Sequence, residues 1–213
     1  MTPDEFQHHC NVSRETMARL ATYGRLLEKW RGAINLVSRG SLGDLWRRHM
    51  LDSAQLYSYI NPIGADPSGA PVILDLGSGA GFPGLVLAIM GAGEVHLVEA
   101  DQRKCTFLEA VARETGTKVM VHARRIEDLP PFATDVVTAR ALAPLDRLLA
   151  YALPFLGPEG EFLVLKGKRI NEELTAAEKH WNMRVERFTS ASDPTGVILR
   201  LRDIARAPAH GCS

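Results

Sequence analysis

The chain has 213 residues, of which 46% are hydrophobic and 23% are charged. At roughly 150 residues per domain, this length predicts one compact domain with an appendage and excludes a large multidomain protein. The composition excludes a disordered, collagen-like or coiled-coil chain. The 25 basic and 25 acidic side chains cancel, so net charge gives no general argument for nucleic-acid binding.

Targeting and redox features are few. No apolar run approaches the roughly 20 residues of a membrane-spanning helix, and residues 1–10 are too polar and acidic for a secretory signal. We therefore expect a soluble cytoplasmic protein without a membrane partner. The odd number of cysteines, without short paired spacing, predicts free thiols rather than disulfides or a zinc site. They are Cys10, Cys105 and Cys212. His8 and His9 adjoin Cys10 but cannot readily converge on one ion, so no metal is predicted.

Residues 13–60 predict a small helical cap, because apolar side chains recur at helical spacing. Between Arg14 and Arg48, eight Lys or Arg stand against three acids. This local excess indicates a polyanion-binding face, although a solvated helix surface is the commoner explanation of such charge. Residues 61–71 are rich in turn-forming types. We therefore place the boundary there, with a cap over 1–70 and a second unit over 71–213.

Strand and helix patterns alternate after this boundary, which predicts a doubly wound, mostly parallel α/β sheet. The predicted strands are 72–76, 94–99, 118–123, 135–139 and 161–166, and the predicted helices are 84–90, 102–115, 145–153 and 170–181. Two further strand-like runs, 184–188 and 197–202, have no helix between them. They are expected to pair as an antiparallel hairpin at the edge of a seven-stranded sheet.

A glycine-rich loop follows the first predicted strand, in the sequence V-I-L-D-L-G-S-G-A-G-F-P-G over residues 72–84. Such a loop lets backbone amides approach a ligand closely. Residues 79–84 satisfy GxGxxG, so a nicotinamide cofactor is one interpretation. Asp75 favours S-adenosylmethionine, because a carboxylate at the strand tip would repel a pyrophosphate but suits a sulfonium and an ammonium. Alternatively, Asp75 only caps loop amides.

Polar residues also follow the next two predicted strands. Glu99 is predicted to accept both ribose hydroxyls, which would serve either cofactor. The alternative is a strand-end acid beside the next helix, where Asp101 is the better cap. Ile126 and Glu127 lie at the edge where ligands collect in open sheets. They are candidates for contact with an adenine ring and its amine, or else ordinary loop residues.

Together these residues resemble the RsmG (GidB) family of bacterial 16S rRNA guanine-N7 methyltransferases. The resemblance covers nearly the whole chain and is clearest over residues 30–169. It rests on Trp30-Arg31 with Asn35-Leu-Val-Ser38, His49-Met-Leu-Asp-Ser53, Leu74 to Gly84, Glu99 with Arg103-Lys104, Ala139-Arg-Ala141 and Lys166-Gly167. The glycine motif alone would suit many methyltransferases. The His and Asp-Ser pairing in a helical cap is more selective.

The resemblance implies a Rossmann-like class I S-adenosylmethionine-dependent methyltransferase, which we expect to be a monomer. Its substrate would be N7 of guanine 527 of 16S rRNA, in the small ribosomal subunit or its precursor. The resemblance also implies donor contacts from Gly77, Phe82, Ile126, Glu127 and Arg140. Combined with the residues above, the predicted donor site comprises Asp75, Gly77, Gly79, Gly81, Phe82, Glu99, Ile126, Glu127 and Arg140.

The chemistry of this reaction needs few catalytic groups. Guanine N7 carries an unprotonated lone pair, so no general base is required, and acceleration comes from a near-attack geometry and fixed dipoles. Arg140 is the candidate catalytic residue, because an arginine can contact guanine O6 or phosphate. His49, Asp52 and Ser53 share one helix face, so they are expected to form a polar junction between cap and sheet rather than a hydrolase triad.

Basic side chains at the same edge predict a rim for rRNA phosphates. They are Arg47, Arg48, Arg124, Arg125, Lys166, Lys168 and Arg169. Two other functions stay open: an NAD(P)-dependent reductase, which GxGxxG supports, and a non-catalytic rRNA-binding assembly factor with a vestigial donor site. A methyltransferase that acts on a small molecule is less consistent with the sequence, because such an enzyme has no evident use for a basic helical cap. Residues 205–213 carry no interpretable pattern.

Overall fold

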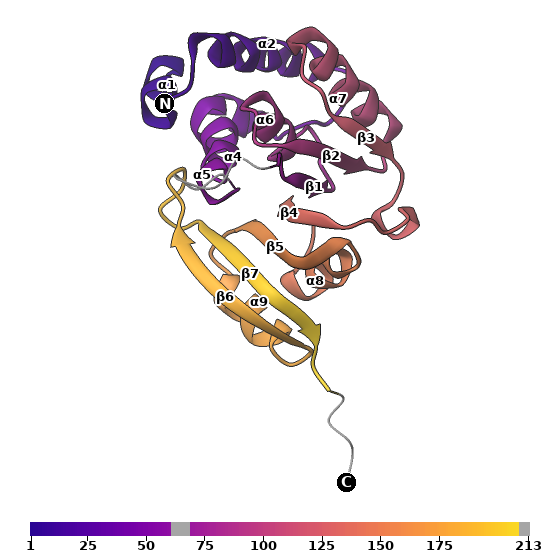
Figure 1. Ribbon diagram of the computed structural model, residues 1–213. Coiled ribbons are helices and arrows are strands. Elements are labelled where there is room, and N and C mark those ends of the chain that lie inside the picture. The colour runs from indigo at the N-terminus through magenta and orange to yellow at the C-terminus, as the bar shows by residue number, and fades with distance from the viewer. Residues whose placement is uncertain (61–68, 209–213) are drawn as a thin grey trace.

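The computed structural model describes residues 1–60 and 69–208 (Figure 1). Within these residues a seven-stranded sheet has the order β3-β2-β1-β4-β5-β7-β6. The strands are β1 (Val72–Leu76), β2 (Glu94–Glu99), β3 (Met120–Ala123), β4 (Thr134–Arg140), β5 (Leu156–Lys166), β6 (Trp181–Thr189) and β7 (Val197–Arg206). Strands β1 to β5 run parallel to one another, and β7 runs antiparallel to β5 and β6. The predicted mostly parallel sheet with an antiparallel edge pair is confirmed.

Helices cover both faces of the sheet (Figure 1). They are α6 (Gly84–Ile89) and α7 (Gln102–Thr115) on the face that carries the cap, and α8 (Leu145–Ala152) and α9 (Ile170–Ala177) on the other. The connections also contain the short 3-10 helices η2 (Ile126–Asp128) and η3 (Leu153–Phe155). Side chains alternate along each strand, so Ile73 joins the buried cluster under the cap and Leu74 joins the cluster under α8.

The helix predicted over 170–181 is wrong at its end, because α9 stops at Ala177 and Trp181 begins β6. Trp181 is 2% exposed, and its indole Nε1 donates a hydrogen bond of 2.9 Å to Asp146 Oδ1. This contact with α8 and the pairing of Trp181 with Arg206 on β7 are tertiary interactions. They override a local apolar pattern that suits a helix equally well.

The cap consists of α1 (Pro3–Cys10), α2 (Arg14–Trp30), α3 (Arg39–Leu42), the π-helix η1 (Trp46–Leu51), α4 (Asp52–Ala54) and α5 (Tyr57–Ile60). It is therefore helical, as predicted, but broken into pieces, and it starts before residue 13. A capping box formed by Thr2 and Glu5 begins α1. Helix α2 lies along α7 (Figure 1), and Leu20 and Leu27 join the same buried cluster as Phe107. The cap and the sheet thus share one core.

Some predictions fall wholly or partly outside the described residues. The proposed boundary at 61–71 is described only from residue 69, and Cys212 and most of the 205–213 segment lie beyond residue 208. Cys10 and Cys105 are free thiols. No helix in residues 1–60 or 69–208 is both long and apolar enough to cross a membrane. Over the same ranges, no group of three or more His, Cys, Asp or Glu side chains is arranged to hold a metal ion.

Candidate active site

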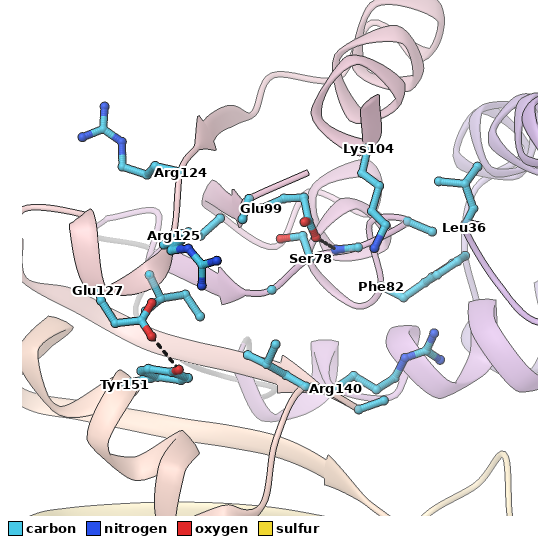
Figure 2. Close-up of a pocket in the computed structure, with 18 of the residues that line it drawn as sticks. Leu36, Ser78, Phe82, Glu99, Lys104, Arg124, Arg125, Glu127, Arg140 and Tyr151 are labelled. Carbon is cyan, nitrogen blue, oxygen red and sulfur yellow. Dashed lines mark hydrogen bonds between the residues drawn. The ribbon is translucent and has the colours of Figure 1, made fainter. Parts of the chain in front are cut away.

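A pocket of about 440 Å³ opens at the carboxyl ends of β1, β2 and β4 (Figure 2). This volume is in the range of small-ligand sites, and open α/β sheets bind ligands at this edge. Seven of the nine residues predicted for the donor site line the pocket. They are Gly77, Gly79, Phe82, Glu99, Ile126, Glu127 and Arg140. In the view of Figure 2, Glu99 lies between Glu127 on one side and Phe82 and Arg140 on the other.

Glu99 anchors the glycine loop and faces the pocket. Its Oε2 accepts a hydrogen bond of 2.8 Å from the amide of Gly79, and its Oε1 accepts one of 2.8 Å from the amide of Asp101. Gly79 has a φ of +58°, a left-handed conformation that glycine adopts without strain. Each carboxylate oxygen can accept a second hydrogen bond. Glu99 can therefore bind two neighbouring hydroxyl groups without releasing the loop.

Ile126 and Glu127 form the opposite wall, on η2. Glu127 Oε1 accepts a hydrogen bond of 2.7 Å from the Tyr151 hydroxyl, which in turn accepts one of 2.7 Å from Arg147 Nε. The bond from Tyr151 holds the pKa of Glu127 below its usual range, so this wall presents an ionised acceptor. Tyr151 and Arg147 also line the pocket. The sequence did not predict them, because α8 carries no motif that marks a site.

Asp75 lies beneath the loop and does not line the pocket. Its side chain is completely buried, and Oδ1 accepts a hydrogen bond of 2.8 Å from Thr138 Oγ1 on β4. Burial raises the pKa of Asp75 to about 6, although the hydrogen bond from Thr138 opposes this shift. The carboxyl group therefore supports the strand ends from below rather than facing a ligand, which is closer to the capping alternative.

Gly81 also faces away from the pocket, toward the cap. Its φ is +100°, and a Cβ there would lie 2.8 Å from Tyr23 Oη and 2.9 Å from Leu85 Cβ. The Tyr23 hydroxyl donates to the Ala80 carbonyl, and its ring stacks on Phe82 with centroids 5.2 Å apart. The close approach of Gly81 thus lets the cap hold the pocket loop in place.

Replacing Gly81 by Ala should lower the melting temperature by roughly 4–20 °C. Overpacking costs about 1–3 kcal/mol and left-handed alanine about 1–2 kcal/mol, and each kcal/mol shifts the melting temperature of a chain this size by about 2–4 °C. Thermal denaturation followed by circular dichroism measures the change. Gly91→Ala is the matched control, because Gly91 has a φ of +78° but nothing within 4 Å of the added Cβ. Equal melting temperatures for the two variants would contradict this account of the contact.

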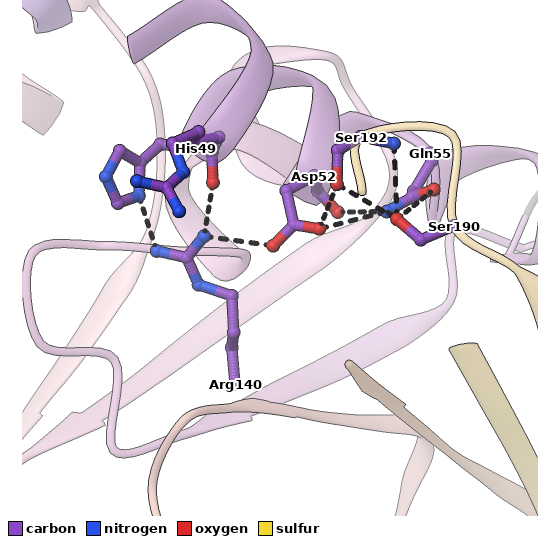
Figure 3. Close-up of polar contacts among 7 residues, drawn as sticks. His49, Asp52, Gln55, Arg140, Ser190 and Ser192 are labelled. Atoms are coloured by element: carbon purple, nitrogen blue, oxygen red, sulfur yellow. Dashed lines mark hydrogen bonds and ion pairs between the residues drawn. The ribbon is translucent and has the colours of Figure 1, made fainter. Parts of the chain in front are cut away.

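Arg140 ends β4 and reaches across to the cap (Figure 3). Its Nη1 donates to Asp52 Oδ2 at 3.0 Å and to the Arg48 carbonyl at 3.1 Å, and its Nη2 donates to His49 Nδ1 at 2.8 Å. The guanidinium carbon lies 5.0 Å from the centre of the Phe82 ring. These bonds use three of the five N–H groups of the guanidinium. Within residues 1–60 and 69–208 no acceptor takes the other two, which remain for a ligand on a cation whose position is fixed.

His49 is neutral in this arrangement. Arginine cannot accept a hydrogen bond, so His49 Nδ1 is the acceptor and the ring proton is on Nε2. Burial, with the charges of Arg140 and Arg48, lowers the pKa of His49 to about 4. Its ring stacks on Phe82 with centroids 4.9 Å apart. As the sequence predicts, His49 and Asp52 join cap to sheet, whereas Ser53 is fully buried behind them.

A second pocket, of about 900 Å³, adjoins the first. The two share the lining residues Leu36, Val37, Arg140, Ala141 and Leu142. Ala141 has a φ of +51°, and such strain in a non-glycine residue collects at functional sites. Leu142 is 38% exposed. The segment after β4 therefore forms the partition between the two pockets, with Arg140 reaching both.

The seven predicted rim cations do not behave alike. Arg124 and Arg125 border the first pocket, and Arg48, Lys168 and Arg169 are exposed at the second. Arg47 is exposed and pairs with Asp44 at 2.7 Å. Lys166 is poorly placed for the phosphate contact predicted for it, because its side chain is only 9% exposed. Its Nζ donates hydrogen bonds to Glu173 at 2.6 Å and to the Ala143 carbonyl at 2.8 Å. Lys166 therefore secures the partition segment.

Comparisons with known proteins identify a family of similar sequences. The model of the GidB family, rRNA small subunit methyltransferase G, matches residues 16–195. Ribosomal RNA small subunit methyltransferase G of Paramagnetospirillum magneticum is 54% identical over 99% of this chain and all of its own length, and that of Rhodospirillum rubrum is 55% identical over 97% and all of its own.

Solved structures with this fold are more distant in sequence. A TehB-like SAM-dependent methyltransferase from Corynebacterium glutamicum has a TM-score of 0.56 at 14% identity, and the match covers 85% of this chain and 98% of that one. A ribosomal protein L11 methylase from Lactobacillus delbrueckii has a TM-score of 0.55 at 19% identity, with 72% and 78% covered. At these identities the similarity establishes the fold.

Proposed function

The chain belongs to the rRNA small subunit methyltransferase G family, and from this premise we propose that it methylates N7 of guanine 527 in 16S rRNA. The observation that carries the proposal is the position of Arg140, fixed to the cap and reaching two adjoining pockets. A reaction that joins a small donor to a large acceptor needs two compartments that meet at one point.

S-adenosylmethionine is the methyl donor of the proposed reaction, and when bound it supplies an electrophilic methyl group on a sulfonium. The first pocket suits its parts. Glu99 has acceptor positions left for a ribose diol, and Ile126 offers an apolar contact for an adenine ring beside the acceptor Glu127. Phe82 and Arg140 remain for the rest of the donor. Arg140 also lines the second pocket, where the methyl group must be presented.

The second pocket is the compartment for the guanine. An enzyme that modifies a base takes it out of the stack and holds it in a pocket. The N7 lone pair attacks without prior loss of a proton, so a fixed donor serves better than a base. The free N–H groups of Arg140 can bond guanine O6 or a phosphate.

Transfer of labelled methyl groups tests this function. Purified 30S subunits and free 16S rRNA, both lacking the modification, are incubated with the protein and labelled S-adenosylmethionine. Label in the rRNA of either substrate supports the proposal and identifies the preferred form. Calorimetric binding of NADPH instead of S-adenosylmethionine would point to a reductase. Binding to rRNA without any transfer would point to an assembly factor.

Exposed cations at the second pocket should make rRNA binding depend on salt. Arg48, Lys168 and Arg169 each neutralise about one phosphate, so replacing all three by Ala should reduce the slope of log K against log salt by about 2–3. Filter binding between 50 and 200 mM salt, a range chosen because such contacts weaken steeply across it, measures the slope. Arg113 lies in the last turn of α7, away from the carboxyl ends of the strands, so Arg113→Ala should leave the slope unchanged. A flat salt dependence for the unaltered protein would exclude this group of contacts.

A further inference from the structure

The carboxylate of Asp52 joins three separate segments of the chain (Figure 3). Its Oδ2 accepts the hydrogen bond from Arg140 at the end of β4, and its Oδ1 accepts one of 2.6 Å from Ser192 Oγ in the loop between β6 and β7. Arg140 and Ser192 are 88 and 140 residues away from Asp52 in sequence. The side chain of Asp52 is 18% exposed, so solvent screens these contacts only in part.

Gln55, one turn further along the cap, reinforces the same connection. Its Nε2 donates to Asp52 Oδ1 at 3.2 Å and to Ser190 Oγ at 3.1 Å. Its Oε1 accepts a hydrogen bond of 2.8 Å from the amide of Ala191. The cap therefore holds the backbone of the β6–β7 loop as well as two of its hydroxyl groups.

This connection lies at the second pocket and not at the first. Asp52, Ser190 and Asp193 line the second pocket together with Arg140, whereas the first pocket includes Arg140 but neither Asp52 nor any residue of the β6–β7 loop. Loss of the Asp52 carboxylate would release the guanidinium and one wall of the second pocket together. The donor pocket would keep its other contacts, since Glu99 and Glu127 are held independently.

We infer that Asp52 is a positioning residue for the acceptor base. It fixes the position of Arg140 relative to the 190–196 loop, so that guanine N7 approaches the donor methyl group in line. The inference rests on the proposed function and extends it to a side chain outside the donor pocket. A misplacement of about 1 Å can cost about 100-fold in rate, so one carboxylate that fixes two walls controls turnover without contacting the donor.

Steady-state methyl transfer to 30S subunits separates the effects of Asp52 on the two substrates. Asp52→Ala should lower kcat with the rRNA substrate by about 10–100-fold, while the Kd for S-adenosylmethionine, measured by calorimetry, stays within about twofold. Asp52→Asn keeps the shape of the side chain and can still connect Arg140 to Ser192, so its kcat should fall less than that of Asp52→Ala. Ser192→Ala should lower kcat as well. The double variant Asp52→Ala/Ser192→Ala should have the same kcat as Asp52→Ala alone, because both substitutions remove the same connection between cap and loop. Glu15→Ala, which breaks an exposed ion pair on the cap, is the control.

Amide hydrogen exchange of residues 190–196 tests the connection apart from catalysis. Exchange should be faster in Asp52→Ala than in the unaltered protein and unchanged in Glu15→Ala. Unchanged exchange, unchanged kcat or additive losses in the double variant would each overturn the inference. Should the unaltered protein transfer no methyl group to rRNA, the proposed function fails by itself, and the exchange data still decide whether Asp52 holds the loop.

Discussion

Replacing Arg140 by Ala is expected to reduce methyl transfer to 30S subunits by about 100–1,000-fold, the effect of losing a preorganised polar group at a reaction centre. The guanidinium is held by Asp52, His49 and the Arg48 carbonyl, so it meets the acceptor without reorganising. The variant should fold, because this side chain belongs to neither buried hydrophobic cluster. Single-turnover kinetics with bound donor measures the loss.

Arg140→Lys supplies the comparison that separates charge from geometry. Lysine keeps the charge but lacks the planar fork that reaches His49 and Asp52 together, so it should recover only part of the activity. Arg184→Ala, which removes an exposed arginine of β6 paired with Asp203, should have no effect. Turnover by Arg140→Ala at the level of this control would remove Arg140 from the site.

Replacing Glu99 by Ala should weaken S-adenosylmethionine binding by about 100-fold. Two hydroxyl hydrogen bonds to a carboxylate contribute about 3 kcal/mol together, and each 1.4 kcal/mol is tenfold in Kd. The loop should loosen as well, because the amides of Gly79 and Asp101 lose their acceptor. Isothermal titration calorimetry measures the Kd.

Two variants control for the charge of Glu99. Glu99→Gln keeps one carbonyl acceptor and should bind the donor at an intermediate level. Glu94→Gln changes a glutamate at the other end of the same strand, far from the pocket, and should bind normally. A Kd for Glu99→Ala within twofold of the unaltered protein would exclude contact between Glu99 and the ribose.

The sheet could be predicted because its strands are short apolar runs bounded by glycine, charge and helix patterns, and because alternating strands and helices permit few topologies. The residues at the ends of those strands then fall at one edge, which is why Gly77, Glu99 and Arg140 could be placed in one site. Boundaries were less predictable. Trp181 suits a helix as well as a strand, and its contact with Asp146 decides between them.

Site residues that are defined by tertiary contacts could not be predicted, because no local sequence motif marks them. Tyr151 lies on an ordinary amphipathic helix, and Ser192 lies in a polar loop, yet they contact Glu127 and Asp52. Asp75 and Lys166 show the opposite case. Their residue types suggested ligand contacts, but the alternation of β1 directs Asp75 beneath the loop, and Glu173 from α9 neutralises Lys166.

Mass spectrometry of nuclease fragments of 16S rRNA, after incubation of unmodified 30S subunits with the protein and S-adenosylmethionine, examines donor, acceptor and position in a single measurement. We expect a gain of one methyl group at guanine 527, with the N7 position identified by the chain cleavage that a cationic N7-methylguanine permits. The same incubation with Arg140→Ala should give a much smaller gain. A methyl group on another atom or nucleotide, or none at all, would contradict the account.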